Sequence, residues 1–429
     1  MKRGSLLVPF VLCLSSLAVP VATSAADPLP RAQPQSVGLS PQRLARIGRV
    51  VNADIERGRL PGMVVAIARK GRLAYYESFG YLDKPAGTPM PKDAIFAIAS
   101  MTKPMVGVGV MQLVEDTRIQ MSDPVSKWFP ALGKLPVAVL KTDAAGQAIM
   151  EAVAAKRQIT VHDLLRHTSG LPYGGRGTTP VHKMFPASSG SAAAEFTGKE
   201  FIDRLSRVNL LYQPGSAWDY GFSIDVLGLI IEAESGRTLG AYLNDRIWKP
   251  LGMTDTGFVV PPEKARRYAR ALPNDPDTGK PQAFPDRTKP DKFECGGGCA
   301  VSTAADYIRF GQMLLNRGRL GAAQILASRT VDYMTANHLE AGTQNYIELA
   351  DPTKAGFDFG LTMAVRTSAG APGIMGYPGD YTWSGATGTD FWVSPKEQLV
   401  VVFLTAAPGP IRWHYRRLMN ALVYQAIVD

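Results

Sequence analysis

The sequence predicts an α/β (α+β) fold in which one antiparallel sheet is built from N- and C-terminal segments and is flanked by helices, with an inserted mainly helical domain. Three observations predict this fold. Strand-like apolar runs occur before residue 81, they return after residue 356, and helical patterns with many chain breakers lie between them. We therefore expect residues 27–117 and 293–429 to form the α/β domain and residues 118–292 to form the insertion.

The N-terminal segment predicts a helix, a hairpin and a second helix. Ser40 suits the N-cap of a helix over 41–55, because a proline follows it at the first helical position. The apolar runs 62–68 and 73–80 flank a Lys-Gly-Arg turn and favour two paired strands. The apolar residues in 106–114 predict a largely buried helix.

The central segment predicts helices separated by long loops. One helix is expected to start within 159–165, and another to span 223–234, where Gly236 ends it. Runs rich in Gly, Pro, Ser, Ala or charge favour surface loops, which could form a lid. These runs are 141–157, 174–199 and 272–292.

The C-terminal segment predicts a return to the sheet. A helix is expected over 302–315, followed by strands over 357–365, 381–393 and 399–404. A last helix over 410–427 closes the chain.

The first 26 residues have the three regions of a secretory signal peptide. Lys2 and Arg3 precede an apolar run over 6–19, and small residues follow it. A membrane anchor is the alternative, but the run is shorter than the ~20 residues that a span requires. We expect a signal peptide over 1–26, a periplasmic or secreted mature protein, and no integral membrane span after its removal.

Composition and charge exclude some functions. The chain has 429 residues, 45% of them apolar and 20% charged, which is typical of a globular protein. Loss of Lys2 and Arg3 with the signal would lower the formal charge from +10 to +8. The basic residues form no run, so nucleic-acid binding is not expected. The sequence does not indicate an oligomeric state.

Two cysteines remain after the signal peptide. Cys295 and Cys299 flank three glycines and are expected to pair in an oxidising compartment. Free thiols and half of a metal site are the alternatives. No histidine cluster or second cysteine pair completes a metal site, so we expect no metal and no cofactor.

Ser100 and Lys103 form the only Ser-x-x-Lys in the chain. One helical turn separates them, so the amine can reach the hydroxyl, and a serine nucleophile needs such a base. About one Ser-x-x-Lys is expected by chance in a chain of this length, so the alternative is an N-cap serine followed by a solvated lysine.

Two later stretches could complete a site around Ser100. Tyr220 follows a Gln-Pro-Gly loop and could move protons to and from the serine; the alternative is a half-buried core tyrosine. The segment 383–389, Trp-Ser-Gly-Ala-Thr-Gly-Thr, has small residues where a backbone could approach a ligand closely; the alternative is a packing glycine or a bulge.

These three stretches, in this order, resemble the motifs of the serine β-lactamase and penicillin-recognising superfamily. The chain is most similar to its class C-like branch and to family VIII carboxylesterases, over roughly residues 36–428. The resemblance implies a β-lactamase/transpeptidase-like fold. It also implies that Ser100 attacks a carbonyl, that Lys103 and Tyr220 act as base and acid, and that the N–H groups of Ser100 and Ala386 bind the oxyanion.

Within this resemblance, the strand residues Trp383, Ser384 and Gly385 stand where β-lactamases have Lys-Thr-Gly, and Phe222 stands where the tyrosine motif has Asn. These positions are expected to contact substrate. Loss of the ammonium and the amide should weaken binding of a carboxylated β-lactam, and aromatic walls suit neutral apolar acyl groups.

His167 has no proton to carry in a Ser-Lys-Tyr scheme, so we expect it to be a hydrogen-bonded loop residue. The chain has no Gly-x-Ser-x-Gly, so an α/β-hydrolase nucleophile elbow is not supported. We therefore expect a serine carboxylesterase that acts on a small-molecule ester (or amide) with a short or medium acyl chain. The alternatives are a class C-type β-lactamase, a DD-peptidase or other D-amino-acid peptidase, an acyltransferase, and a non-catalytic penicillin-binding-type module.

Overall fold

A computed structural model of the chain describes residue 1 and residues 27–146 and 148–429. The predicted signal peptide over 1–26 lies outside the described residues, apart from Met1. None of the described helices is long and apolar enough to cross a membrane.

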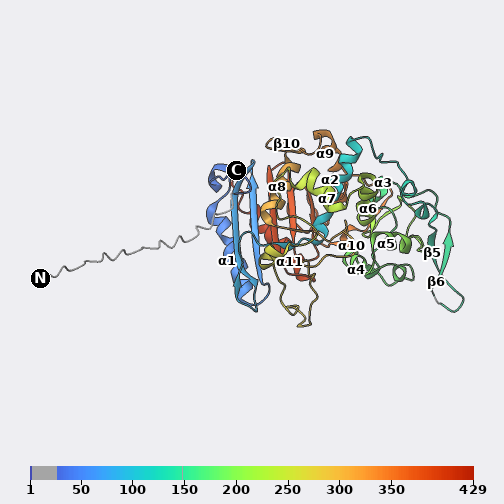
Figure 1. The fold of residues 1–429 in the computed structure, drawn as a ribbon, viewed down its shortest axis with the longest axis horizontal. Helices are drawn as coiled ribbons and strands as arrows, with labels where there is room; N and C mark the ends of the chain where they lie inside the picture. The colour runs from blue at the N-terminus through green and yellow to red at the C-terminus, as the bar shows by residue number, and fades with distance from the viewer. Residues whose placement is uncertain (2–26, 147) are drawn as a thin grey trace.

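One eight-stranded sheet organises the fold. Every neighbouring pair in it is antiparallel, in the order β12-β13-β14-β15-β16-β1-β2-β3. In Figure 1 the blue N-terminal strands lie beside the red C-terminal strands. The strands are β1 Gly62–Arg69, β2 Arg72–Asp83, β3 Thr88–Pro89, β12 Phe357–Phe359, β13 Ala364–Arg366, β14 Tyr381–Ser384, β15 Asp390–Ser394 and β16 Leu399–Thr405.

The two ends of the chain meet where β1 pairs with β16. Met63 lies opposite Thr405, and Arg69 lies opposite Leu399. All eight residues of β1 are buried, because helices cover both faces of the sheet at this strand. The expected sheet, built from N- and C-terminal segments and flanked by helices, is confirmed.

Two helical layers cover the sheet. Met63, Val65 and Ile67 of β1 pack in one apolar cluster with α1 (Pro41–Glu56) and α11 (Ile411–Tyr424). The alternate residues of β1 pack in a second cluster with α2 (Thr102–Glu115) and α8 (Ala304–Leu315). Alternation of side chains between the two faces of a strand therefore divides the core into two halves.

The segment between β3 and α8 holds several helices joined by long loops, and its part from α3 to α6 lies away from the N-terminal strands, at the green end of the molecule in Figure 1. It holds α3 Val161–Leu165, α4 Ser189–Glu195, α5 Gly198–Leu205, α6 Ser223–Ser235 and α7 Leu239–Leu243, besides α2. The exact limits of an inserted domain over 118–292 stay a prediction.

Short elements connect these layers. The small strand pairs are β4 Phe96–Ala97 with β8 Val301–Ser302, β5 Val137–Thr142 with β6 Ala148–Val153, β7 Ala217–Trp218 with β11 Gln344–Asn345, and β9 Arg319–Leu320 with β10 Ala323–Gln324. Two further helices are α9 Ser328–Met334 and α10 Ile347–Ala350. Single helical turns lie at Pro34–Val37, Ala99–Met101, Val125–Lys127, Pro130–Lys134, Gly174–Arg176, His182–Met184, Asn244–Trp248 and Pro262–Arg267.

Several predicted loops and strands differ from the structure. The stretch 141–157 was expected as a loop, but much of it belongs to the β5–β6 hairpin, because Asp143 and Gly146 close a tight turn. The loop expected over 174–199 contains α4. The strands expected over 357–365 and 381–393 are each split in two by a turn.

Truncation of Leu404 to alanine tests the core at the centre of the sheet. Leu404 lies on β16 and is fully buried, so Leu404→Ala should lower the free energy of unfolding by about 2–5 kcal/mol, measured by denaturant titration. Leu349→Ala is the matched control, because Leu349 is 75% exposed and should lose less than about 0.5 kcal/mol. Equal losses in the two variants would contradict this description of the core.

Candidate active site

Ser100 lies in a tightly held turn between β4 and α2. The residue before it, Ala99, has a φ of 44°, which is uncommon for a residue other than glycine and costs on the order of 1 kcal/mol or more. The strand before it is fixed by two hydroxyls, since Thr387 donates to the carbonyl of Ala97 at 2.5 Å and Thr389 donates to that of Ile98 at 3.1 Å. These bonds hold the backbone at the serine.

Lys103 is the centre of the site. Its side chain is fully buried, and its Nζ lies 3.5 Å from Ser100 Oγ and 3.2 Å from the hydroxyl of Tyr173. It also donates to the carbonyl of Gly297. An ammonium has three hydrogens and needs three acceptors when it is buried, and these three groups match that requirement.

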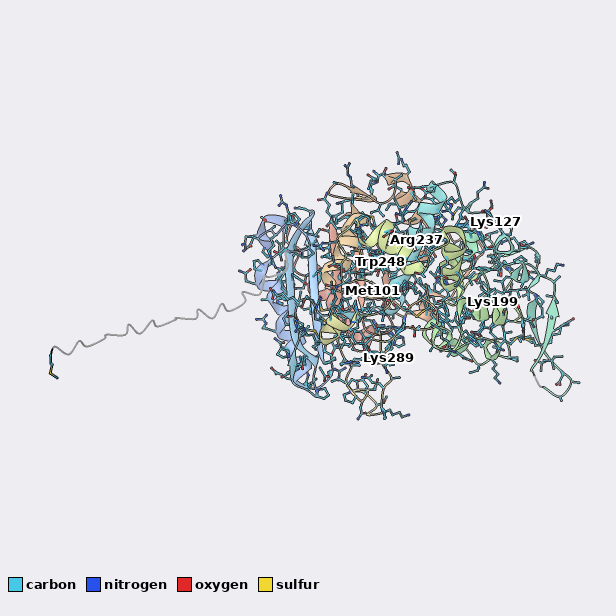
Figure 2. All side chains as sticks on the ribbon, viewed as in Figure 1. Met101, Lys127, Lys199, Arg237, Trp248 and Lys289 are labelled. Atoms are coloured by element: carbon cyan, nitrogen blue, oxygen red, sulfur yellow. A yellow bond between two sulfur atoms is a disulfide. The ribbon has the colours of Figure 1, made fainter. Side chains whose placement is uncertain are left out.

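Tyr220 lies over the lysine. Lys103 Nζ is 4.4 Å from the centre of the Tyr220 ring, and the Tyr220 hydroxyl accepts a hydrogen bond of 3.2 Å from Trp383 Nε1. Ser100, Tyr220 and Ala386 line one cavity of about 360 Å³, and Lys103 lies directly beneath it. The structure therefore brings together Ser100, Lys103 and Tyr220, the three residues that the sequence singled out. In Figure 2, Met101, the neighbour of Ser100, lies near the middle of the molecule.

Four predicted substrate contacts do not line this cavity. Trp383 is buried behind Tyr220, and Phe222 is fully buried with its ring 4.7 Å from that of Tyr173. The hydroxyl of Ser384 donates to Asp351, away from Ser100. Gly385 packs against the carbonyl of Ile98, where an added Cβ would lie at 2.4 Å. The expectation that the rings of Trp383 and Phe222 line the substrate cavity therefore differs from the structure, in which both rings are buried in the core.

Buried polar groups that the sequence did not predict hold Lys103 in place through a chain of hydrogen bonds. The Tyr173 hydroxyl lies 2.6 Å from that of Ser189, and Ser189 donates to Asp225 at 2.8 Å. Asp225 also accepts from the N–H of Gly297 at 2.9 Å, and the carbonyl of Gly297 accepts from Lys103. Burial raises the pKa of Asp225 to about 6.

Asp225 offered one signal in the sequence, because it interrupts an otherwise apolar stretch of α6. Tyr173 and Ser189 lie in loop segments whose positions depend on the fold, and no local pattern marks them.

Cys295 and Cys299 are joined by a disulfide that closes the loop around Gly297. A Cβ on Gly297 would lie 2.3 Å from both Asp225 Oδ2 and Ser189 Oγ, so only glycine fits there. The cross-linked loop thereby presents one backbone N–H to Asp225 and one carbonyl to Lys103.

His167 differs from its expected role. Its ring is fully buried among Trp218, Tyr220 and Phe359, and neither ring nitrogen has a hydrogen-bond partner in the part of the chain that the structure describes. The expectation of a hydrogen-bonded side chain is wrong, because the imidazole packs as an aromatic ring. Burial and the nearby Lys103 lower its pKa well below the ordinary value.

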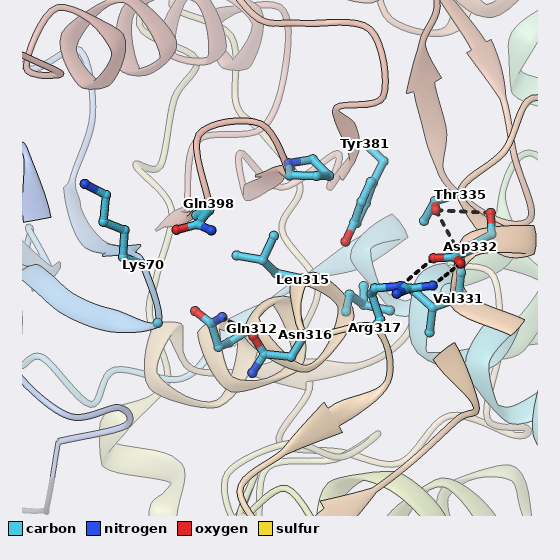
Figure 3. Close-up of a pocket in the computed structure, with 13 residues that line it drawn as sticks. Lys70, Gln312, Leu315, Asn316, Arg317, Val331, Asp332, Thr335, Tyr381 and Gln398 are labelled. Carbon is cyan, nitrogen blue, oxygen red and sulfur yellow. Dashed lines mark hydrogen bonds and ion pairs between the residues drawn. The ribbon is translucent and has the colours of Figure 1, made fainter. Parts of the chain in front are cut away.

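Larger hollows lie elsewhere but lack this chemistry. One of about 510 Å³, shown in Figure 3, lies between the end of α8, α9 and the strands, and its lining includes Lys70, Gln312, Arg317 and Tyr381. Another, of about 840 Å³, has Gln112 and Arg246 in its lining. Neither contains Ser100. Among the described residues, no group of three or more His, Cys, Asp or Glu could hold a metal ion.

The chain is similar to several known proteins over most of its length. A family model described as Beta-lactamase matches residues 47–425. Esterase EstB from Burkholderia gladioli is 30% identical over 379 residues, which cover 84% of this chain and 90% of that protein. Simvastatin synthase from Aspergillus terreus has a similar structure, with a TM-score of 0.74 and 23% identity over 89% of this chain and 98% of that one. EstCE1, a hydrolase with promiscuous acyltransferase activity, also has a similar structure, with a TM-score of 0.69 and 24% identity. The match covers 89% of this chain and 99% of that one.

Replacement of Trp383 by phenylalanine tests the bond to Tyr220. Trp383→Phe keeps an aromatic ring but removes the N–H donor to Tyr220, so kcat should fall about threefold to tenfold. Trp392→Phe is the matched control on the neighbouring strand, because the Trp392 Nε1 has no partner. If kcat falls equally in Trp383→Phe and Trp392→Phe, the loss comes from altered packing of the sheet and not from the hydrogen bond to Tyr220.

Replacement of Asp225 by asparagine tests the buried carboxyl. Its pKa of about 6 lies above the value near 3.9 of an unfolded chain, so the unfolded state ionises first as pH rises. The wild-type free energy of unfolding should therefore fall between about pH 4 and 6, by on the order of 2 kcal/mol from this group. In Asp225→Asn, the difference between unfolding at pH 4.5 and 7.5 should shrink by about that amount. Asp203→Asn is the control, because its side chain is exposed, and it should leave this pH-dependent difference in the free energy of unfolding unchanged. If Asp225→Asn also leaves the difference unchanged, the raised pKa does not belong to Asp225.

Proposed function

The chain belongs to the beta-lactamase family, as its motifs predicted, and from this premise we propose that it is a serine carboxylesterase acting on esters with short or medium acyl chains. The observation that carries the proposal is the placement of Ser100, Lys103 and Tyr220 around one cavity, with the lysine amine 3.5 Å from the serine oxygen. The similarity to an esterase over most of the chain supports a serine hydrolase.

In the proposed reaction, Lys103 stays an ammonium and Tyr220 reacts as the phenolate, so Ser100 Oγ attacks the ester carbonyl while its proton passes to the Tyr220 oxygen. The N–H groups of Ser100 and Ala386 would stabilise the oxyanion of the tetrahedral intermediate. The intermediate collapses as the alcohol leaves with the proton that Tyr220 returns. Water then attacks the acyl-enzyme and gives its proton to Tyr220. Tyr220 passes this proton to Ser100 as the acid leaves, which restores the serine.

Two positions favour an ester over a β-lactam. An indole stands at Trp383, and its N–H donates to Tyr220 instead of facing the cavity. Phe222 fills the core beneath Tyr173. These positions therefore present neither an ammonium nor a side-chain amide to a ligand, and those are the groups that the resemblance assigns to β-lactam binding.

The alternatives use the same chemistry with a different acceptor or acyl donor. An alcohol in place of water would give an acyltransferase, and a peptide or lactam in place of the ester would give a D-amino-acid peptidase, a DD-peptidase or a class C-type β-lactamase. We also propose that the mature protein is periplasmic or secreted, on the signal-like pattern of its first 26 residues.

A comparison of two substrates tests the proposal. The mature protein should hydrolyse p-nitrophenyl butyrate much faster than a chromogenic cephalosporin, and Ser100→Ala should lower kcat by at least about 10³-fold, because it removes the nucleophile. Ser206→Ala, at a partly exposed site that ends α5, is the control and should retain full activity. Faster turnover of the cephalosporin would overturn the ester assignment, and an active Ser100→Ala would overturn the nucleophile.

A further inference from the structure

The cavity around Ser100 contains an unexpected pair of cations. Among the described residues that line it, the only charged ones are Arg176 and Arg287, and no carboxylate joins them. Both come from segments that the sequence suggested only as surface loops, 174–199 and 272–292. The lining therefore carries two guanidinium groups beside Ser100, and that of Arg287 is paired with Asp291.

Arg287 is nearly buried, with 6% of its surface exposed. Among the described residues, only one of its terminal nitrogens has a partner, in an ion pair with Asp291, and its Nε has none. A guanidinium has five N–H donors, and leaving buried donors unpaired is costly. Gly190, which also lines the cavity, lacks a side chain beside the other terminal nitrogen: a Cβ there would lie 3.6 Å from it. Arg287 therefore has donors to spare next to the cavity.

Arg176 lies at the other cation position, with its guanidinium 5.7 Å from the centre of the Tyr220 ring. Its loop is held in place, because the N–H groups of Gly174 and Gly175 donate to the carbonyls of Pro186 and Ala187. No carboxylate in the described part of the chain lies within ion-pair distance of it.

Two titratable groups lie near this cation. Burial raises the pKa of Asp219 to about 6 and Arg176 lowers it, so this carboxyl is ionised at neutral pH and offsets part of the positive charge. Arg412 is close enough that Arg176 depresses its pKa, which adds positive charge on the same side.

We propose that the natural substrate is an ester that carries a carboxylate, which Arg287 and Arg176 bind while Ser100 attacks the ester carbonyl. A planar guanidinium matches a carboxylate in shape and charge. The carboxylate stays unchanged in the reaction: the bond from Ser100 Oγ to the acyl carbon forms, the bond to the alcohol oxygen breaks, and water later releases the acyl group. The inference rests on the proposed esterase function and replaces the expectation of a neutral acyl group.

In the β-lactamases that the sequence resembles, a lysine on the sheet strand supplies the positive charge beside the nucleophile. Here Trp383 occupies that strand position, and the positive side chains at the cavity, Arg176 and Arg287, come from two loops. The cavity volume of about 360 Å³ suits a small substrate with both groups.

Two pairs of chromogenic esters test the proposal and locate the carboxylate. Mono-p-nitrophenyl adipate, compared with its methyl ester, places the charge on the acyl half. The butyryl ester of 5-hydroxy-2-nitrobenzoate, compared with p-nitrophenyl butyrate, places it on the alcohol half. In the wild-type protein, at least one charged ester should exceed its neutral partner in kcat/KM by about tenfold or more, mainly through a lower KM.

Variants of the arginines should remove this preference. Arg287→Met and Arg176→Met should each lower the ratio of charged to neutral kcat/KM by about tenfold, and Arg287→Lys should retain part of it. Arg266→Gln is the control, because it removes one positive charge at an exposed site outside the cavity lining. A loss of preference in Arg266→Gln as large as in Arg287→Met would assign the effect to overall charge and overturn the proposal.

The remaining outcomes separate this proposal from the esterase function. Rapid hydrolysis of the neutral esters with no preference for either charged one would overturn the carboxylate site and leave the esterase function standing. If no ester is hydrolysed, the esterase function fails. Titration calorimetry with adipate then tests the carboxylate site separately. Adipate that binds the wild type and binds Arg287→Met about tenfold more weakly supports the site. Equal binding to both proteins, or no binding to the wild type, overturns it.

Discussion

The buried ammonium of Lys103 is the constraint on which the site depends. A charge without solvent must find hydrogen-bond acceptors, and the three that Lys103 finds come from distant parts of the chain: Ser100, Tyr173 and Gly297. Tyr173 and Gly297 in turn connect to Ser189 and Asp225. The result is a closed ring of hydrogen bonds, so each member is positioned by two neighbours rather than by its own loop. Such a ring resists displacement of any single group.

The same logic explains how a strained backbone persists at Ser100. The left-handed conformation of Ala99 is held by the hydroxyls of Thr387 and Thr389, which bind the two carbonyls just before it. These threonines lie in the turn between β14 and β15, so the ends of two interior strands of the large sheet hold the backbone at Ser100. The sheet thereby shapes the site through this turn.

The sequence predicted what short-range geometry determines. One helical turn places Ser100 beside Lys103 in any helical setting, and apolar runs such as that of β1 identify central strands by themselves. Tyr220 could be assigned only through the resemblance, since its contact with Lys103 spans more than a hundred residues. The directions of Trp383 and Phe222 could not be predicted, because a position on a strand or helix does not say which face the fold buries. Tyr173, Ser189 and the two cavity arginines lie in loops, where only the folded structure brings them together.

The pairing of β1 with β16 has a consequence for how the protein is made. The two strands are more than three hundred residues apart, and Arg69 at the end of β1 forms an ion pair with Asp429. The central sheet therefore cannot close until residues 399–405 have left the ribosome, and contacts of such long range form slowly. Because the turn that holds Ser100 depends on that sheet, the cavity at Ser100 cannot take its final form before then.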